Sequence, residues 1–208
     1  IHEKFIAICQ QVIIRQDRSQ IYAISQFLSD IHEVVYYRSD AIQYLSWVNT
    51  AKKILDLNDS HESFAPDNID GFTESLNSVN GSLACFIIKL YELSKDDEEG
   101  QKSCEIFIKL LIDKDENGYA LIRLLNFYSF IKGRNSLFAQ KELLPYLFSE
   151  KKKIKLLAWK GFLSNACLEF AEFREIRKEF FNILQYALYH NDKQLIQGLT
   201  DLYVYSIY

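Results

Sequence analysis

Apolar residues recur at helical spacing through most of this sequence, and few residues interrupt them. Only two prolines and seven glycines occur among the 208 residues, which is too little turn chemistry for many short strands. The clearest stripe consists of Ala84, Ile87, Ile88 and Tyr91, at positions i, i+3, i+4 and i+7. The pattern predicts an all-α protein, and a chain of this length can bury about 70% of its extended surface in a core.

A capped helix start is expected at Asn77-Ser78-Val79-Asn80-Gly81, just before that stripe. The side chain of Ser78 or Asn80 can accept a hydrogen bond from a backbone N–H of the first turn, and Gly81 lets a neighbouring backbone come close. Such a start can also bind an anion, but this one has a single glycine and no adjacent lysine. We interpret it as the corner between two helical pairs, with Gly81 present for close packing.

The first part of the chain predicts amphipathic helices of about 15 residues joined by very short turns, so that neighbours run antiparallel. A polar run from Leu57 to Asp67 then breaks the pattern. We expect an N-terminal helical sub-bundle over residues 1–58 and a continuous helical solenoid region over residues 59–208. The expected stripes are Phe5, Ile8, Cys9, Val12 and Ile13, then Ile24, Phe27, Leu28, Ile31 and Val35, and then Ile42, Leu45, Val48, Ala51, Ile54 and Leu55.

The second half continues the helical pattern. The segment Tyr119–Ile131 is apolar nearly all round, which is typical of a helix buried on several sides, and Gly133 is well placed as its C′ residue. Pro145 lies within the next stripe, and because an interior proline costs a helix about 3 kcal/mol, we expect a bend or a new start at Leu144-Pro145. Further helices are expected at Lys151–Leu163, Phe173–Tyr189 and Leu195–Tyr208.

About ten helices in hairpin-like succession predict an irregular α-solenoid of HEAT-like helical pairs, with an irregular bundle as the alternative. The sequence has no Met and begins inside a helical pattern. It is therefore either an excerpt from a longer protein or a sequence with some residues missing, and we expect a fragment. The apolar end Tyr203-Val204-Tyr205-Ser206-Ile207-Tyr208 suggests that a further repeat covers it.

Composition argues against several classes of function. A net charge of −4 and a pI near 5.6 disfavour a protein that mainly binds phosphate backbones. No apolar run reaches 18 residues, and the opening residues lack a signal-peptide pattern, so neither a membrane span nor secretion is expected. Cys9, Cys85, Cys104 and Cys167 lie far apart without a Cys-x-x-Cys pair, which favours buried free thiols in a reducing cytoplasm.

No local motif assigns chemistry to the chain. Asp113-Lys114-Asp115-Glu116-Asn117-Gly118 copies the first half of an EF-hand loop, but the position of its bidentate Glu falls on Leu124, so a polar turn is the preferred interpretation. The four histidines do not cluster, and no glycine-rich phosphate loop or Gly-x-Ser-x-Gly elbow occurs. We expect no catalytic residue, no metal and no cofactor in this segment.

Two groups of residues are candidates for an interaction surface. The 15 Phe, 13 Tyr and two Trp residues are mostly at core positions of the expected helices, but Tyr36-Tyr37-Arg38 and the C-terminal tyrosines combine residue types that anchor protein interfaces. Lys151, Lys152 and Lys153 begin an expected helix, where cations oppose the helix dipole. A solvated face explains these lysines at least as well.

An ordered set of motifs carries a family resemblance. It consists of Asn77-Ser78-x-x-Gly81, the apolar helix near Tyr119–Ile131, Leu143-Leu144-Pro145, and Trp159-x-Gly161-Phe162-Leu163. The set resembles the helical C-terminal region of large bacterial antiphage defence proteins, such as those with an N-terminal sirtuin-like NADase, and of STAND NTPases. The resemblance covers residues 70–190 and implies a HEAT-like solenoid that senses a phage protein or holds an effector domain inactive, with catalysis elsewhere in the full protein.

We therefore expect a non-catalytic, cytoplasmic protein-interaction and sensing module whose partner is a phage protein or another domain of the same chain. A scaffold that supports oligomerisation has the same sequence features and remains an alternative. A helical enzyme with a site formed by distant residues is a third interpretation. A nucleic-acid-binding domain that uses Lys151 to Lys155 with Trp159 and Lys160 is the fourth.

Overall fold

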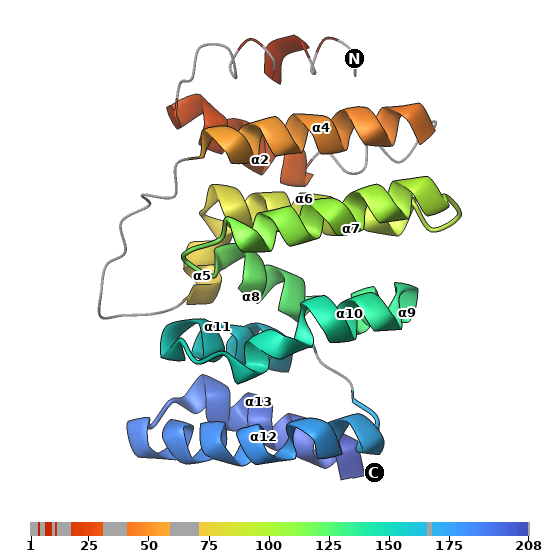
Figure 1. The fold of residues 1–208 in the computed structure, drawn as a ribbon. Coiled ribbons are helices and arrows are strands. Elements are labelled where there is room, and N and C mark those ends of the chain that lie inside the picture. The colour runs from red at the N-terminus through yellow and green to blue at the C-terminus, as the bar shows by residue number, and fades with distance from the viewer. Residues whose placement is uncertain are drawn as a thin grey trace. The chain divides into compact units, whose positions relative to one another are not determined.

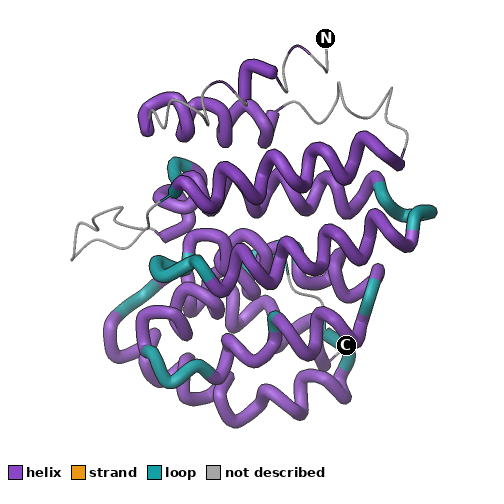
Figure 2. The backbone as a smooth tube through the Cα atoms, turned by 45° about the horizontal axis from the view of Figure 1, so that its top comes forward, coloured by secondary structure: helices purple, strands orange, loops and turns teal. Residues whose placement is uncertain are grey.

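The computed structural model describes a helical protein, and its described residues contain no β-strand (Figures 1 and 2). The all-α prediction is therefore confirmed for this part of the chain. No helix in it is long and apolar enough to cross a lipid bilayer. The described residues are Lys4, 7–9, Gln11, 18–30, 41–58, 71–165 and 168–207.

The chain forms two compact units, Ile1–Ala120 and Leu121–Tyr208. The polar run that suggested a boundary near residue 58 lies largely outside the described residues, so that boundary stays a prediction. In the first unit the helices are α2 (Arg18–Asp30), α4 (Ala41–Leu57), α5 (Gly71–Leu76), α6 (Val79–Leu93) and α7 (Glu98–Asp113), followed by the start of α8 (Tyr119–Asn126).

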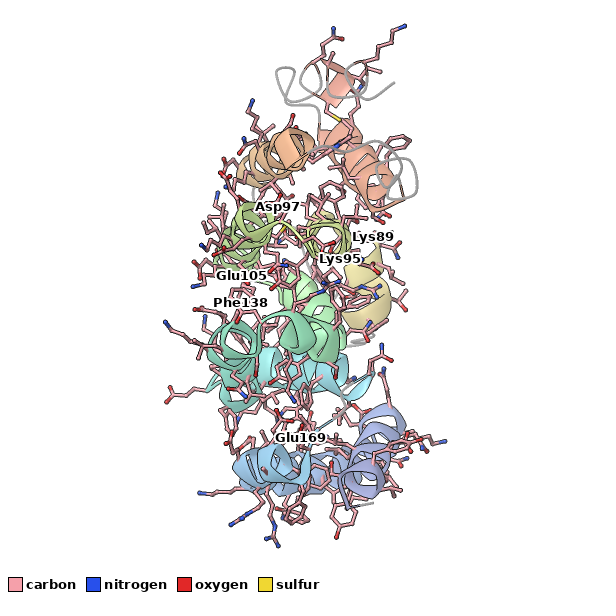
Figure 3. All side chains as sticks on the ribbon, turned by 90° about the vertical axis from the view of Figure 1, so that its right-hand side faces the viewer. Lys89, Lys95, Asp97, Glu105, Phe138 and Glu169 are labelled. Carbon is pink, nitrogen blue, oxygen red and sulfur yellow. The ribbon has the colours of Figure 1, made fainter. Side chains whose placement is uncertain are left out.

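Helix α6 is the centre of the first unit, because α2, α4, α5 and α7 all pack against it. Its apolar side chains are buried on nearly every side, and Trp47 of α4 meets Phe86 edge-on with ring centroids 6.1 Å apart. The expected stripe Cys104, Phe107, Ile108 and Leu111 on α7 is buried as well. Asp97, labelled in Figure 3, caps α7 by accepting from the backbone N–H groups of Glu99 and Gly100.

The start of α6 has the geometry that the sequence predicted. Ser78 is the N-cap, and its hydroxyl oxygen accepts from the backbone N–H of Gly81 at 2.9 Å. A Cβ atom on Gly81 would lie 1.8 Å from the carbonyl oxygen of Ser75, so only glycine allows α5 to approach α6 this closely. The Asn77 side chain donates to the Thr73 carbonyl oxygen, so Asn77 to Gly81 forms a packed corner.

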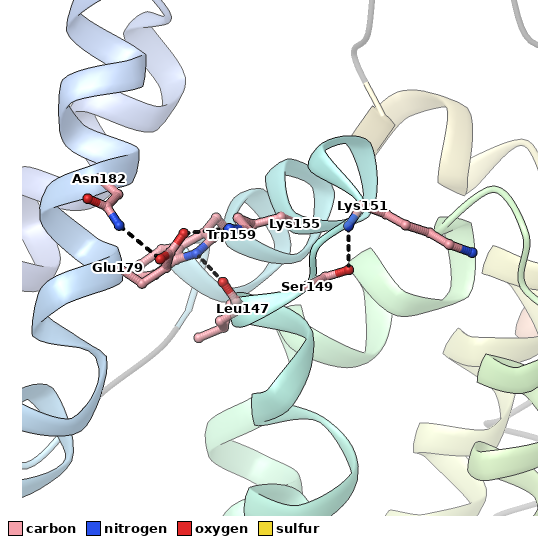
Figure 4. A network of polar contacts seen from close by, with 7 residues as sticks. All are labelled: Leu147, Ser149, Lys151, Lys155, Trp159, Glu179 and Asn182. Atoms are coloured by element: carbon pink, nitrogen blue, oxygen red, sulfur yellow. Dashed lines mark hydrogen bonds and ion pairs between the residues drawn. The ribbon is translucent and has the colours of Figure 1, made fainter.

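The second unit contains α9 (Tyr128–Arg134), α10 (Ser136–Glu142), the 3-10 helix η1 (Leu144–Phe148), α11 (Lys152–Leu163), α12 (Phe170–His190) and α13 (Lys193–Ile207). Trp159 and Phe162 of α11 are fully buried. The indole Nε1 of Trp159 donates to the Leu147 carbonyl oxygen at 3.0 Å (Figure 4). A Cβ atom on Gly161 would lie 2.3 Å from the Ile122 carbonyl oxygen, so this glycine also permits a close backbone approach.

Pro145 lies in the first turn of η1, which confirms the expected new start at Leu144-Pro145. The prediction of one continuous helix over Tyr119–Ile131 is wrong, because the segment is divided at Phe127 into α8 and α9. Asn126 at the break is a weak helix former, and its side chain accepts a hydrogen bond from the Asn165 side chain.

Three further expectations are wrong. Ile8 was expected on the first apolar stripe but is 54% exposed. Gly133 lies inside α9 and is not its C′ residue, because Asn135 ends α9 and at once caps α10 by accepting from the Phe138 N–H. Phe27 was expected on the buried stripe of α2 but is largely exposed, since the core-facing side of α2 consists of Ile21, Ile24, Ser25 and Leu28.

Candidate functional site

Helix α12 presents three different faces along its 21 residues. One face is the core of the second unit, and its members recur every three or four residues, as a buried helical stripe requires. The other two faces flank the core face. They differ in whether charged side chains from other helices of the unit contact them. The buried core face consists of Phe173, Ile176, Phe180, Ile183 and Ala187.

One flank of α12 is paired with cations from neighbouring helices of the same unit. Glu172, Glu179 and Tyr186 are spaced by seven residues and share one side of the helix. The ammonium group of Lys132 lies 2.5 Å from the Glu172 carboxylate, and that of Lys155 lies 2.7 Å from Glu179. Lys152 lies 4.5 Å from the Tyr186 ring centroid, within cation–π range. We call this side the paired flank.

The carboxylate of Glu179 on the paired flank accepts hydrogen bonds from Lys155 and Asn182 (Figure 4). Its partial burial acts to raise the pKa, but hydrogen bonds from Lys155 and Asn182 and the nearby lysine charges outweigh the burial. The pKa of Glu179 is therefore lowered from 4.5. The ionised carboxylate is the form that the folded protein favours.

The opposite flank, which we call the outer stripe, has no such partners. Its residues are separated by three or four positions and so share one side of the helix. Phe170 is 62% exposed, Phe181 45% and Leu188 60%, so these three apolar side chains form an exposed row on one side of the helix. The outer stripe consists of Phe170, Arg174, Arg177, Phe181, Leu184 and Leu188.

The two arginines of the outer stripe are exposed. The Arg177 guanidinium lies 5.9 Å from the Phe181 ring centroid. Among the described residues, no carboxylate forms an ion pair with Arg174 or Arg177. The outer stripe thus combines apolar surface with two positive charges, while the acidic residues of the paired flank are already neutralised.

A pocket of about 150 Å³ opens beside the outer stripe, between α12 and α13. The Tyr203 ring, which forms one wall, stacks on Phe180 with centroids 6.1 Å apart. A cavity of about this volume holds one benzene molecule, whereas drug-sized ligands and cofactors need about 300 Å³ or more. The pocket therefore fits a single large apolar side chain. It is lined by Phe180, Phe181, Leu184, Leu199, Thr200 and Tyr203.

The lining of the pocket gives it no evident chemistry. Five of its six side chains are apolar or aromatic, and the Thr200 hydroxyl donates to the Ile196 carbonyl oxygen of its own helix. General acid–base catalysis needs a titratable group within hydrogen-bond reach of the substrate, and Tyr203 is the single titratable residue in this lining. The arrangement can recognise shape and apolar surface.

The structure places the predicted basic cluster at the start of α11. Lys151 and Lys152 are exposed and Lys153 is half-buried, and the Lys151 N–H donates to the Ser149 hydroxyl oxygen. The residues proposed to support nucleic-acid binding are otherwise engaged: Trp159 is fully buried, and Lys160 is paired with Asp192 at 3.2 Å. Tyr36, Tyr37 and Arg38 lie outside the described residues.

The EF-hand-like loop forms a polar turn. Asp115 is buried, and its Oδ1 accepts from the Tyr119 backbone N–H at 3.1 Å and from the Asn80 side chain at 3.2 Å. Gly118 adopts a positive φ of 81°, which suits glycine at a tight turn before α8. No group of three or more metal-ligating side chains occurs within the described ranges.

Cys9, Cys85 and Cys104 are free thiols, as predicted, and Cys9 and Cys104 are buried while Cys85 is half-buried. Burial raises the pKa of Cys104 to about 12, and it does the same for Cys9. Thiols that stay protonated at neutral pH are poor nucleophiles. Cys167 lies outside the described residues.

The sequence interpretation singled out the C-terminal tyrosines, and Tyr203 and Tyr205 are indeed largely exposed. It missed the outer stripe, although a signal for it exists. Phe170, Arg177 and Leu184 recur every seven residues, as do Arg174, Phe181 and Leu188. A second apolar stripe on a helix whose first stripe already supplies a core marks a surface that is available to a partner.

No family model matches this chain, and no curated protein or solved structure gives a significant match.

Proposed function

We propose that this chain is a helical protein-interaction module that binds its partner through the outer stripe of α12 and the adjacent pocket. The observation that carries the proposal is the pocket itself, which has the volume of one apolar side chain and is bordered by exposed Phe181 and Tyr203. Buried aromatic anchors in such pockets contribute most of the binding energy in many protein interfaces.

The wider architecture that we propose is an irregular α-solenoid of HEAT-like helical pairs. Two observations support it. Helices α6 and α7 pack together across a short turn, and α12 and α13 do the same across Asn191 and Asp192. Repeated helical pairs of this kind present long surfaces to protein partners, and residues on their open sides are free to vary in chemistry.

We further propose that the module belongs to a bacterial antiphage defence protein, in which it senses a phage protein or restrains an effector domain. The ordered motifs Asn77-Ser78-x-x-Gly81, Leu143-Leu144-Pro145 and Trp159-x-Gly161-Phe162-Leu163 support this context. Phage plating on cells that express the whole protein tests it. Phe181→Ser should reduce protection, and protection that is unchanged by Phe181→Ser and by Leu184→Ser counts against this context.

Selection from a library of random 16-residue peptides displayed on yeast tests the interaction module directly. Peptides enriched on the immobilised chain should lose binding to Phe181→Ser and to Leu184→Ser. Leu137→Ser is the matched control, because Leu137 is 74% exposed and lies on α10, away from the pocket lining. If the selected peptides bind all three variants as well as the original chain, or none is enriched, the proposed site is wrong.

A further inference from the structure

The chemistry of the outer stripe narrows the partner further, an inference that rests on the proposed function. We infer that the outer stripe of α12 and the adjacent pocket bind an acidic amphipathic helix, which inserts one large apolar side chain into the pocket and places carboxylates against Arg174 and Arg177. Three features of the second unit support this inference, namely the length of the surface, its charge, and the position of the charge relative to the pocket.

The length and form of the surface favour a helix. The outer stripe extends from Phe170 to Leu188 along one side of α12, which at 1.5 Å per residue is about 27 Å, or the length of an 18-residue helix. Its apolar members occur at helical spacing, so a second helix can lay an apolar face along them. Among the described residues no strand offers an edge for a partner to extend, so β-strand addition has no template here.

The charge of the surface favours acidic partners. Arg174 and Arg177 are the charged members of the outer stripe, and neither forms an ion pair with a described carboxylate. On α12, Glu172 and Glu179 lie on the paired flank and are held by Lys132 and Lys155. Glu175 follows Arg174 in the sequence but is exposed and forms no ion pair with either arginine. A carboxylate from a partner can pair with each arginine in bidentate fashion, and complementary charge also speeds the encounter.

The spacing fixes where those carboxylates must lie. Arg174 precedes Phe181 by seven residues, and Arg177 precedes Leu184 by seven residues. Arg177 is one helical turn before Phe181, with its guanidinium 5.9 Å from that ring centroid, whereas Arg174 is about two turns, or about 10.5 Å, before Phe181 along the helix axis. A partner helix that lies along α12 must carry its acidic residues about four and seven positions from its anchor, on the same side of the helix. An acidic residue adjacent to the anchor would point about 100° away from it around the helix, and so away from both arginines.

Fluorescence anisotropy with labelled 18-residue helical peptides tests the inference. The reference peptide carries a Phe anchor and two Glu residues four and seven positions away, the second carries Lys in place of both Glu, and the third carries Ser in place of Phe. The reference peptide should bind about tenfold tighter than the Lys peptide, a ratio equal to about 1.4 kcal/mol. The Ser peptide should not bind measurably, and the preference for Glu should shrink in 300 mM salt.

Variants of the chain separate the possible outcomes. Arg174→Glu combined with Arg177→Glu should reverse the preference in favour of the Lys peptide. Lys178→Glu is the control, because Lys178 is on the same helix but outside the outer stripe and should leave the preference unchanged. If Glu and Lys peptides bind equally at the pocket, the inference of an acidic partner is wrong, but the proposal of an interaction module is supported. If no peptide binds at the pocket, both the inference of an acidic partner and the proposal of an interaction module are wrong.

A second copy of this chain is the other possible occupant of the site, and a test of self-association excludes or supports it. If sedimentation shows that the chain dimerises and that Phe181→Ser abolishes the dimer, a second copy of the chain occupies the outer stripe and the inference of an acidic partner helix is overturned. A monomer that binds the Glu peptide in preference to the Lys peptide supports it.

Discussion

Helix α6 in the first unit and helix α12 in the second are both long and rich in apolar residues, yet the chain surrounds them differently. Four other helices pack against α6, and its side chains are buried on nearly every side. On α12 the core face is buried, and the carboxylate of Glu179 on the paired flank forms an ion pair with a lysine. On the outer stripe, Phe170, Phe181 and Leu188 are exposed. The apolar residues of α6 stabilise the fold, whereas exposed ones stabilise it little.

The largest effect is expected at the start of α6. Gly81→Leu should lower the free energy of unfolding by about 3 kcal/mol or more, because the new side chain would collide with the Ser75 carbonyl group and force α5 and α6 apart. Urea denaturation measures the change. Gly133→Ala is the control, since no atom lies near its Cβ position, and it should raise stability by about 0.5 to 1 kcal/mol. Unchanged stability of Gly81→Leu would show that the corner is not closely packed.

A comparable loss is expected on the core face of α12. Phe180 is only 2% exposed, and its ring meets Trp159, Phe173 and Tyr203. Phe180→Ala should cost about 3 kcal/mol, because it removes buried surface and leaves a cavity. Thermal unfolding followed by circular dichroism would detect this as a lower Tm. A cost below 1 kcal/mol would mean that α12 is as loosely held on its core face as on its outer stripe.

A smaller effect is expected from the cap of α6. Ser78→Ala removes the acceptor for the Gly81 N–H and should cost about 1 kcal/mol. Ser78→Thr keeps a hydroxyl that can accept from the Gly81 N–H and donate to the Ser75 carbonyl oxygen, and it serves as the control in the same denaturation series. Equal stability of the original chain and Ser78→Ala would mean that another acceptor replaces the serine hydroxyl.

The smallest effect concerns the paired flank. Because the pKa of Glu179 is lower in the folded than in the unfolded chain, its pairing with Lys155 contributes stability above about pH 4.5, and this contribution is lost as the pH falls through the lowered pKa. Glu179→Gln should cost less than about 1 kcal/mol at pH 7. The difference between Glu179→Gln and the original chain should shrink as denaturation is repeated at lower pH. A difference that grows on acidification would contradict the assigned pairing.

The sequence predicted best the features that neighbouring residues determine. The cap at Ser78, the close approach at Gly81 and the break at Pro145 all depend on residues within one or two turns. The break at Phe127 was missed because apolar residues continue on both sides of it and no proline or glycine marks a stop there. Gly133 was misjudged because Asn135 serves two helices at once.

The candidate site was harder to predict than the helices that form it. The pocket requires α13 to lie beside α12, and periodicity within one helix does not indicate which helix will pack against it. The paired flank likewise depends on Lys132, Lys152 and Lys155 from other helices. The sequence feature that could have predicted the site is the second apolar stripe on α12. Its two arginines distinguish this stripe from a buried core face.

The most direct test of the central claim, that the outer stripe serves a partner and not the fold, is to measure Phe181→Ser twice. Its free energy of unfolding and its affinity for the Glu peptide are to be determined on the same preparation. Phe181 is 45% exposed although it is adjacent to buried Phe180, so the account predicts a stability loss below about 1 kcal/mol together with loss of peptide binding. A stability loss similar to that of Phe180→Ala, or full retention of binding, would contradict it.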